Sequence, residues 1–464
     1  MLPTIASGNV ASAISGAYEV ANSCRFNRAD SSYMHKTPGG AGDQQKFTFS
    51  FWIKKCGVDT LQTIFDTEAD DDNQFKIVMN ANGTLTVESK VSDHNDSLTT
   101  TQLFRDPMAW YHICAAYDTT QGTDTNRVKL YVNGTQVTAF NTSNYPAEDL
   151  NTLANAANKL WVGASAQTSN FCDMYIAEFC LIDGQQLTPT SFGEFDEDSP
   201  NIFKPIDVSG LTFGTNGFYL DFEDSSNLGN DAKGGTDLTE VNLDATDQAT
   251  DSPTNNFCTL NPLSNVPADT NTVSEGNCKW VMSAEGTTST FAMSTGKWYM
   301  EYKVGSPTTN WTGVQEINAD IATQYTSANK SATLYLGGAT AYINGSNQGS
   351  GGYGSAWSSG DVGMLAFDAD NARIYFGKDG SWWDTDAFDN ASPTTYLTAT
   401  TGKIYYFRFV KGGNTSCTYE ANFGGCSAFT VSSANQDANG YGNFEFAVPS
   451  GYFALCTKNL AEHG

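Results

Sequence analysis

Residues 360–383 limit the fold of this chain more than any other stretch. Small and apolar residues alternate over 362–367, a polar turn follows at 368–371, and alternation resumes over 373–376. A second turn, at 378–380, ends in a glycine, which supplies the positive φ that tight turns require. Alternation with a period of two residues is typical of β-strands. The stretch therefore predicts a meander of three short antiparallel strands.

Similar short alternations recur along the 464 residues, and long helical periodicities are missing. Residues 46–54 alternate aromatic and polar side chains, and the dipeptide Asn133-Gly134 between two apolar runs is a strong hairpin signal. Aromatic residues make up 12% of the chain, so aromatic rings are expected to carry much of the burial. We predict an all-β protein with two tandem antiparallel β-sandwiches.

The charge of the chain argues against one class of partner. With 24 Lys and Arg against 51 Asp and Glu, the formal net charge is −27, which is unsuited to binding nucleic acid through a basic surface. An acidic surface serves solubility, and calcium binding is the alternative interpretation. No apolar run approaches the ~20 residues of a membrane helix, so we expect no membrane insertion. The N-terminus has no basic residue before Arg25, and we expect no secretory signal.

The ten cysteines include no Cys-x-x-Cys pair, which argues against a zinc site. Several, such as Cys114 and Cys180, lie inside apolar strands. We therefore predict mostly reduced, buried thiols made in a reducing cytoplasm. Cys417 and Cys426 are the first pair to test for a disulfide.

Four blocks in the C-terminal part resemble the SPRY domain family. They are the strand at 296–304, the 360–383 meander with its Gly-Asp entry and Lys-x-Gly turn, the strand at 403–410, and the segment 421–425. The blocks occur in the order of that family. The resemblance implies a SPRY-like sandwich over residues 257–464.

The N-terminal part is similar to laminin-G or concanavalin-A-like jelly rolls. The motifs that carry this likeness are, in order, Phe49-Ser50-Phe51-Trp52-Ile53, Trp110-Tyr111-His112-Ile113, Leu130-Tyr131-Val132-Asn133-Gly134 and Ile176-Ala177-Glu178-Phe179. They imply such a sandwich over residues 24–195. Residues 196–256, rich in Pro, Asp and Gly, are predicted to be an ordered connector. Because Phe218, Leu220 and Phe222 alternate, we expect the connector to add a strand to one sandwich.

The whole arrangement resembles structural proteins of marine tailed bacteriophages that couple these two modules. This resemblance includes residues 192–197, 251–262 and 449–460. It implies a virion protein, either a fibre or a head or tail decoration, which is assembled in the host cytoplasm, forms a homo-oligomer and contacts other virion proteins. The small residues of segment 1–23 would dock on the particle. The outer module would bind host-surface glycan or protein.

Concanavalin-like folds also include glucanases, whose retaining members present Glu-x-Asp-x-x-Glu on one strand with two carboxylates ~5 Å apart. Two near-matches, Glu194-x-Asp196 and Glu68-x-Asp70, lack the second glutamate. His112 lies in an apolar strand and is interpreted as structural. Other hydrolase and phosphate-loop motifs do not occur, so we expect no enzyme. A carbohydrate-active enzyme or a free lectin is the alternative function.

Two groups of residues are candidates for ligand binding. Glu68, Asp70 and Asp72 belong to an acidic run whose oxygens suit calcium, and a solvated loop explains the same run. Five aromatic residues beside Gly- and Ser-rich segments suit sugar or partner binding: Trp311, Tyr353, Trp357, Trp382 and Trp383. We expect the loops around the first three to face outward. For Trp382 and Trp383, packing against the core is the alternative.

Overall fold

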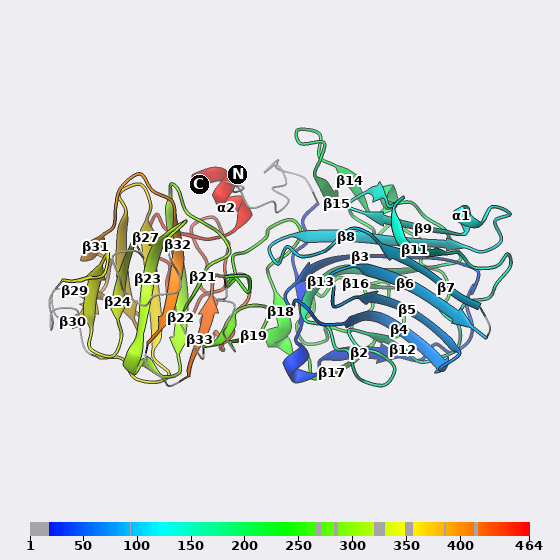
Figure 1. Ribbon diagram of the computed structural model, residues 1–464, viewed down its shortest axis with the longest axis horizontal. Coiled ribbons are helices and arrows are strands. Elements are labelled where there is room, and N and C mark those ends of the chain that lie inside the picture. The colour runs from blue at the N-terminus through cyan, green and yellow to red at the C-terminus, as the bar shows by residue number, and fades with distance from the viewer. Residues whose placement is uncertain are drawn as a thin grey trace. The chain divides into compact units, whose positions relative to one another are not determined.

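The computed structural model describes residues 18–92, 94–264, 271–282, 286–319, 330–348, 356–384, 387–412 and 416–464. The chain forms two compact units that divide between Asn256 and Phe257. Both units are built almost entirely of strands (Figure 1).

The first unit contains two eight-stranded sheets. The first sheet has the order β10-β9-β8-β3-β13-β1-β18, and β16 also pairs with β13. Its strands are β1 (Ser23–Phe26), β3 (Lys46–Lys55), β8 (Trp110–Asp118), β9 (Val128–Val132), β10 (Thr135–Gln136), β13 (Met174–Asp183), β16 (Phe218–Leu220) and β18 (Gln248–Ala249). The predicted Asn133-Gly134 turn joins β9 to β10, with φ of 46° and 75°.

The second sheet has the order β11-β7-β6-β5-β4-β12-β2-β17. Its strands are β2 (Tyr33–Lys36), β4 (Gln62–Asp70), β5 (Asn73–Met79), β6 (Leu85–Val91), β7 (His94–Thr100), β11 (Phe140–Asn144), β12 (Leu160–Val162) and β17 (Thr239–Val241). Phe49 of β3 stacks on Phe75 of β5 with ring centroids 5.6 Å apart, and both rings are fully buried. The two sheets therefore pack face to face around an aromatic core.

The first sheet is buried on both faces. On its outer side, Cys114, Cys180 and Ile182 pack in one buried cluster with residues of the following segment, namely Phe192, Val208, Phe213 and Tyr219. This segment also forms the hairpin β14 (Gly193–Phe195) and β15 (Phe203–Pro205). The strand expected from the alternation at 218–222 is present as β16, where Phe218 pairs with Leu181 of β13. The segment 196–256, which the sequence sets apart as a connector, is thus part of the first unit.

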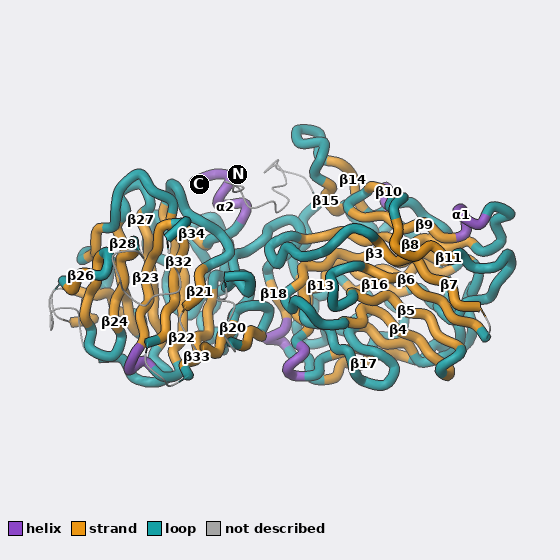
Figure 2. Tube along the Cα trace, in the orientation of Figure 1, coloured by secondary structure: helices purple, strands orange, loops and turns teal. Residues whose placement is uncertain are grey.

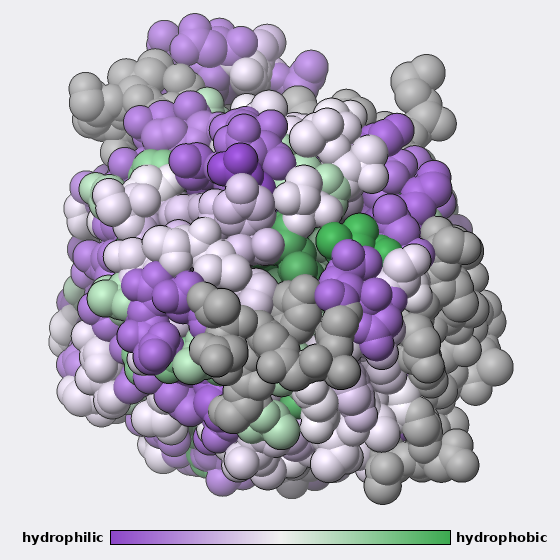
Figure 3. Space-filling model, turned by 90° about the vertical axis from the view of Figure 1, so that its left-hand side faces the viewer, coloured by the Kyte–Doolittle hydropathy of each residue, from purple (hydrophilic) through white to green (hydrophobic). Residues whose placement is uncertain are grey.

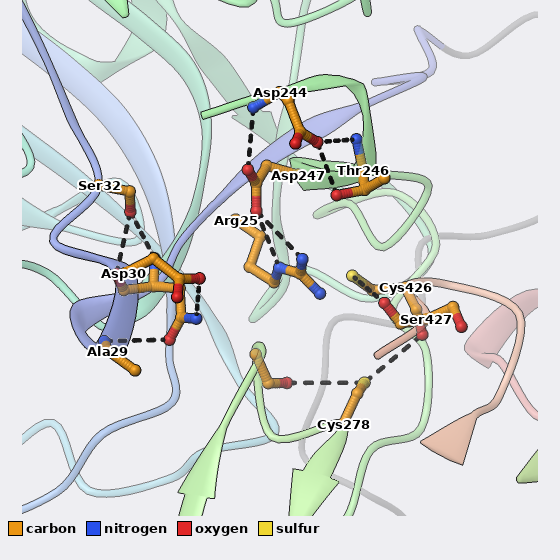
Figure 4. A network of polar contacts seen from close by, with 12 residues as sticks. Arg25, Ala29, Asp30, Ser32, Asp244, Thr246, Asp247, Cys278, Cys426 and Ser427 are labelled. Atoms are coloured by element: carbon orange, nitrogen blue, oxygen red, sulfur yellow. Dashed lines mark hydrogen bonds and ion pairs between the residues drawn. The ribbon is translucent and has the colours of Figure 1, made fainter. Parts of the chain in front are cut away.

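Two buried ion pairs fasten the end of this unit. The Arg25 guanidinium lies 3.1 Å from the Asp247 carboxylate, and Lys54 Nζ lies 2.5 Å from Asp251 Oδ2. Figure 4 shows Asp247 between Arg25 and the short turn that begins at Asp244, whose backbone N–H donates to the Asp247 carboxylate. All four charged side chains are buried. Asp247 and Asp251 flank the last strand, β18, so these contacts tie the segment around β18 to strands β1 and β3.

The second unit also contains two large sheets. The ten-stranded sheet comprises β19 (Thr272–Ser274), β20 (Lys279–Met282), β33 (Cys417–Asn422), β22 (Lys297–Val304), β27 (Val362–Asp368), β28 (Arg373–Lys378), β29 (Ser381–Asp384) and β30 (Ala387–Asn390), with β31 (Tyr396–Thr398) on β28 and β34 (Phe453–Ala454) on β22. The six-stranded sheet runs β21 (Gly286–Thr288), β32 (Tyr405–Lys411), β23 (Asn310–Glu316), β24 (Ser331–Tyr335), β25 (Thr340–Ile343) and β26 (Ser346–Asn347). Tyr302 of β22 and Phe409 of β32 pack edge to face, so these sheets also form a sandwich.

The meander predicted at residues 360–383 is present as β27, β28 and β29. Asp368 forms the first turn by accepting the backbone N–H of Asn371 at 3.0 Å. Asp379 and Gly380 form the second turn with φ of 50° and 87°. Glycine is needed there because few other residues tolerate this backbone region.

The all-β prediction is confirmed. Within the described residues, the α-helices are the short α1 (Asp124–Arg127) and α2 (Thr457–His463), and strands dominate the trace (Figure 2). None of the helices in this part of the chain has the length and apolar character needed to cross a membrane. All ten cysteines are buried free thiols, Cys417 and Cys426 included.

Candidate ligand-binding face

The second sheet of the first unit turns one face to the core and the other outward. In β4, Phe65 belongs to the core, so the alternating neighbours Asp66 and Glu68 lie on the outward side. Successive cross-strand partners form one row of residues across this side. The row runs from β17 to β11 in the order Thr239, His35, Trp161, Asp66, Lys76, Glu88, Ser97 and Asn144. We call the outward side the open face and this row its central row. The strands that carry it lie side by side in Figure 1.

The open face differs from the outer side of the first sheet in its access to solvent. His35, Lys76, Glu88 and Ser97 are half-buried, in contrast to the buried outer residues of the first sheet. A half-exposed sheet face that mixes aromatic, acidic, basic and amide side chains is suited to binding polar ligands. The open face is therefore the candidate binding surface of this unit.

Asp66 is the most unusual residue of the open face because it is fully buried there. Its Oδ2 accepts the backbone N–H of Ala166 at 2.8 Å and lies 3.7 Å from Lys76 Nζ. Its Oδ1 is buried and has no hydrogen-bond partner among the described residues. Burial raises the pKa of this carboxyl to about 7, even though Ala166 and Lys76 favour its charged form.

Trp161 lies beside Asp66 on the neighbouring strand, with the two residues directly paired in register. Trp161 is 8% exposed. Its Nε1–H group is buried, and no described residue accepts a hydrogen bond from it. Lys159 Nζ lies 5.2 Å from the centre of the Trp161 ring. An acceptor and a donor, both without partners, thus lie on adjacent residues of the central row.

Aromatic rings border this pair on the β2 side. The Tyr33 ring centroid lies 6.0 Å from that of His35 and 6.2 Å from that of Phe171, and all three residues are half-buried. Burial and the nearby Lys159 ammonium lower the pKa of His35, so the imidazole is neutral at pH 7. These rings provide an apolar edge next to the polar row.

Acid–amine contacts border the pair on the β5 side. Lys76 Nζ lies 3.2 Å from Glu68 Oε2 and 3.7 Å from Asp66 Oδ2, so one ammonium contacts both carboxylates. The Gln167 side chain donates to Glu68, and Gln74 Nε2 donates to Glu88 Oε1 at 3.2 Å. A network of this kind fixes side-chain positions, which suits recognition of a ligand.

The acidic run that the sequence offers to calcium does not converge on one point. Glu68 faces Lys76, whereas Asp72 lies 2.8 Å from Lys90. Asp70 accepts the backbone N–H of Asp72 at 2.9 Å, as in a turn. No group of three or more His, Cys, Asp or Glu in the described ranges is placed to hold a metal ion. The run is instead a strand end and a turn held by local contacts.

The aromatic residues that we expected at the surface are buried. Trp311 stacks on Tyr335 at 4.8 Å, and Trp357 stacks on Tyr302 at 5.6 Å. The four described members of the group are 3–6% exposed: Trp311, Trp357, Trp382 and Trp383. The prediction that Trp311 and Trp357 lie in outward-facing loops available to a ligand is wrong, because Tyr335 of β24 covers the Trp311 ring and Tyr302 of β22 covers the Trp357 ring. Tyr353 lies outside the described residues.

For Trp382 and Trp383 the core interpretation fits the structure. Trp382 belongs to a buried cluster of the second unit, and its ring centroid lies 6.3 Å from that of Tyr299.

Figure 3 looks at one side of this unit, where most of the described residues in view are hydrophilic or neutral.

The carboxylates of the other near-match to a glucanase motif lie elsewhere in the first unit. Glu194 lies in β14 and Asp196 directly follows it, and Lys204 Nζ of β15 contacts both carboxylates, at 3.3 and 3.6 Å. His112 is fully buried, its Nε2 lies 2.8 Å from Ser50 Oγ, and burial lowers its pKa to about 3. This environment supports the structural interpretation of His112.

Comparisons with known proteins support the fold. A family model described as "Concanavalin A-like lectin/glucanases superfamily" matches residues 29–190. No curated protein sequence matches the chain.

Three solved structures show partial likenesses, each with a TM-score of 0.28. The SPRY domain of human HERC1 is 14% identical, over 37% of this chain and 99% of that one. The TRIM65 PSpry domain is 12% identical, over 38% and 90%. The heptameric SAP-like pentraxin of Limulus polyphemus is 15% identical, over 37% and 80%. These values are too low for the likenesses to bear on function. The family model thus matches part of the first unit, in a chain that is all-β.

Proposed function

We propose that this chain is a non-enzymatic binding protein of a bacteriophage virion, a fibre or a head or tail decoration, whose first unit binds host-surface glycan through the open face. The observation that carries the binding proposal is the pair of Asp66 Oδ1 and Trp161 Nε1, two buried polar atoms without described partners on an otherwise half-exposed surface. Buried polar groups are almost always paired, and exceptions call for an explanation. A ligand that pairs with both atoms supplies one.

Binding is favoured over hydrolysis because of the position of Lys76. A glycosidase needs one protonated and one ionised carboxyl on either side of the scissile bond. Here the Lys76 ammonium lies 3.7 Å from Asp66 Oδ2 and 3.2 Å from Glu68 Oε2, so it occupies the space between the two carboxyls where the scissile bond would have to lie, and leaves only Asp66 Oδ1 open to a ligand. The alternative, a carbohydrate-active enzyme or a free lectin, predicts sugar release or the absence of the protein from particles.

The virion assignment rests on the sequence resemblance of residues 192–197, 251–262 and 449–460 to bacteriophage structural proteins. It also rests on the gain in avidity when many weakly binding copies are presented on one particle. A single millimolar site supplies only ~4 kcal/mol of binding free energy. Many copies on one particle raise the avidity by ~10²–10⁴ without any new contact. In this proposal the particle-docking part is the N-terminal segment 1–23, of which residues 1–17 lie outside the described part. The chain forms a homo-oligomer and also contacts other virion proteins.

The binding proposal is tested by measuring how the purified protein binds to immobilised bacterial and algal polysaccharides. The variants Tyr33→Ala and Phe171→Ala remove half-buried rings from the open face. The matched control is Tyr396→Ala, which removes a ring that is 38% exposed in the second unit. Weaker binding by the first two variants alone supports the proposal. Equal binding by all three would contradict it.

The virion proposal is tested separately with purified particles. We expect the protein to co-purify with them in many copies, and deletion of residues 1–20 to abolish incorporation. A protein that is abundant in the lysate but absent from particles would contradict the virion assignment and leave the open face as the site of a free lectin.

A further inference from the structure

The two unpartnered atoms of the central row restrict the chemistry of the ligand. We propose that Asp66 Oδ1 and Trp161 Nε1 together bind one hydroxyl group of an uncharged polysaccharide, so that the hydroxyl donates to Asp66 and accepts from Trp161. This inference rests on the proposed function, because it names the ligand class of the open face.

The first step is the position of the two atoms. Asp66 and Trp161 are directly paired across β4 and β12, and side chains so paired on one face of a sheet begin ~4.5–5.5 Å apart. The two side chains therefore start from neighbouring points on one face, and the proposal places one small group between their polar ends. The two side chains do not bond to each other, since both atoms are without a hydrogen-bond partner in the described structure.

The second step is the donor and acceptor character of the atoms. Indole Nε1 only donates, and an ionised carboxylate only accepts. Burial raises the pKa of Asp66 to about 7, so the carboxyl is mainly ionised only above that pH. The Ala166 N–H at 2.8 Å and the Lys76 ammonium at 3.7 Å both contact Oδ2, which leaves Oδ1 as the acceptor of the ionised form. A group that satisfies both atoms must donate and accept at once, as a hydroxyl does.

The third step excludes charged groups. An ammonium has no acceptor for Trp161, and a carboxylate or sulfate has no proton for Asp66. The neighbouring Glu68 and Glu88 add negative charge to the same face, and Lys76 is already engaged with Glu68 and Asp66. A charged group at this position would thus leave Asp66 or Trp161 without a partner, whereas a hydroxyl pairs with both. The acidic neighbours disfavour a polymer that brings further negative charge to the face, so a neutral polysaccharide is the better match.

An ordered water molecule is the competing occupant, because water also donates and accepts. Water alone at this position would make the two side chains structural and leave ligand binding independent of them. The competing explanations therefore predict different effects of conservative substitutions.

The experiment measures binding of the full chain, at about one pH unit above the Asp66 pKa of about 7, to dextran and to O-methylated dextran, with carrageenan and alginate as anionic probes. Trp161→Phe keeps the ring but removes the donor, and Asp66→Asn keeps the shape but removes the charge. The matched controls are Trp382→Phe in the core of the second unit and Asp198→Asn on an exposed hairpin loop. We expect at least tenfold weaker dextran binding by each test variant, parental binding by both controls, and weaker parental binding to the methylated polymer than to dextran.

Unchanged dextran binding by Trp161→Phe and Asp66→Asn would overturn the inference and indicate a water-filled site. If either variant fails to fold, the comparison of dextran with its methylated form on the parent decides, and equal affinities overturn the inference. Binding of the parent to the anionic polymers alone, weakened by Tyr33→Ala, would overturn the neutral-ligand inference and leave the proposed function standing. If the parent binds neither the polymers nor host cells, both this inference and the proposed binding function are contradicted.

Discussion

Replacement of Asp251 by Asn should strongly destabilise the first unit. Asp251 and Lys54 are both 1% exposed, and their ionised groups lie 2.5 Å apart. Asp251→Asn keeps a side-chain oxygen for the Trp110 indole, which donates to Asp251 Oδ1 at 3.0 Å. The loss is therefore mainly that of the charge which compensates the buried Lys54 ammonium.

The magnitude follows from the contacts that Lys54 retains. Removing one partner of a buried ion pair typically costs about 3–5 kcal/mol. Asn256 Oδ1 still accepts from Lys54 Nζ at 2.7 Å, and the Tyr175 ring centre lies 5.7 Å from it. These contacts place the expected loss near the lower end, at about 3 kcal/mol.

The assay is urea unfolding monitored by hydrogen exchange and mass spectrometry, which follows the peptides of each unit separately. The control is Asp72→Asn, because Asp72 pairs with Lys90 but its side chain is 73% exposed, so its loss should have little effect. We also expect the double change Lys54→Met with Asp251→Leu to recover most of the stability. A loss for Asp251→Asn no larger than that for Asp72→Asn would refute the reasoning.

Three further predictions concern pH, catalysis and thiols. Burial raises the pKa of Glu178 from an ordinary 4.5 to about 7, so its protonated form stabilises the fold below pH 4.5 and this contribution, about 3 kcal/mol, is lost as the pH rises through 7. Glu178→Gln should therefore reduce the pH dependence of unfolding, and an unchanged dependence would argue against this role. We expect no release of reducing sugar from polysaccharides; release that is abolished by Glu68→Gln or Glu194→Gln would show an enzyme. Titration of the denatured, unreduced protein should find most of the ten cysteines free, and finding almost none would contradict the structure.

The parts of the fold that could be predicted from the sequence depend on local patterns. The meander at 360–383 could be predicted because its alternating residues and its turn residues lie within a few positions of one another. The dipeptide Asn133-Gly134 is by itself sufficient to indicate a hairpin. Phe218 and Leu220 likewise reveal a strand. Their place beside β13 depends on the pairing of Phe218 with Leu181, which no local pattern encodes.

The candidate site was missed for the same physical reason. The alternation of Phe65, Asp66 and Glu68 in β4 shows which residues share a face. That Asp66 lies beside Trp161 depends on the register between β4 and β12, which are far apart in the sequence. For Trp311 the sequence predicted an accessible binding residue, because its Gly-rich surroundings resemble an exposed loop. In the structure, Tyr335 of the adjacent strand covers its ring.

The most direct test of the central claim is amide hydrogen exchange of the whole chain with and without a polysaccharide that it binds. If the ligand binds to the open face, amide exchange should be slower in the bound state at residues 62–70 and 159–171. These ranges contain Asp66, Trp161 and Ala166, whose backbone N–H donates to Asp66. Peptides of the second unit should exchange equally in both states. Protection confined to residues 356–384 of the second unit, with none at 62–70 or 159–171, would contradict the assignment of the binding surface.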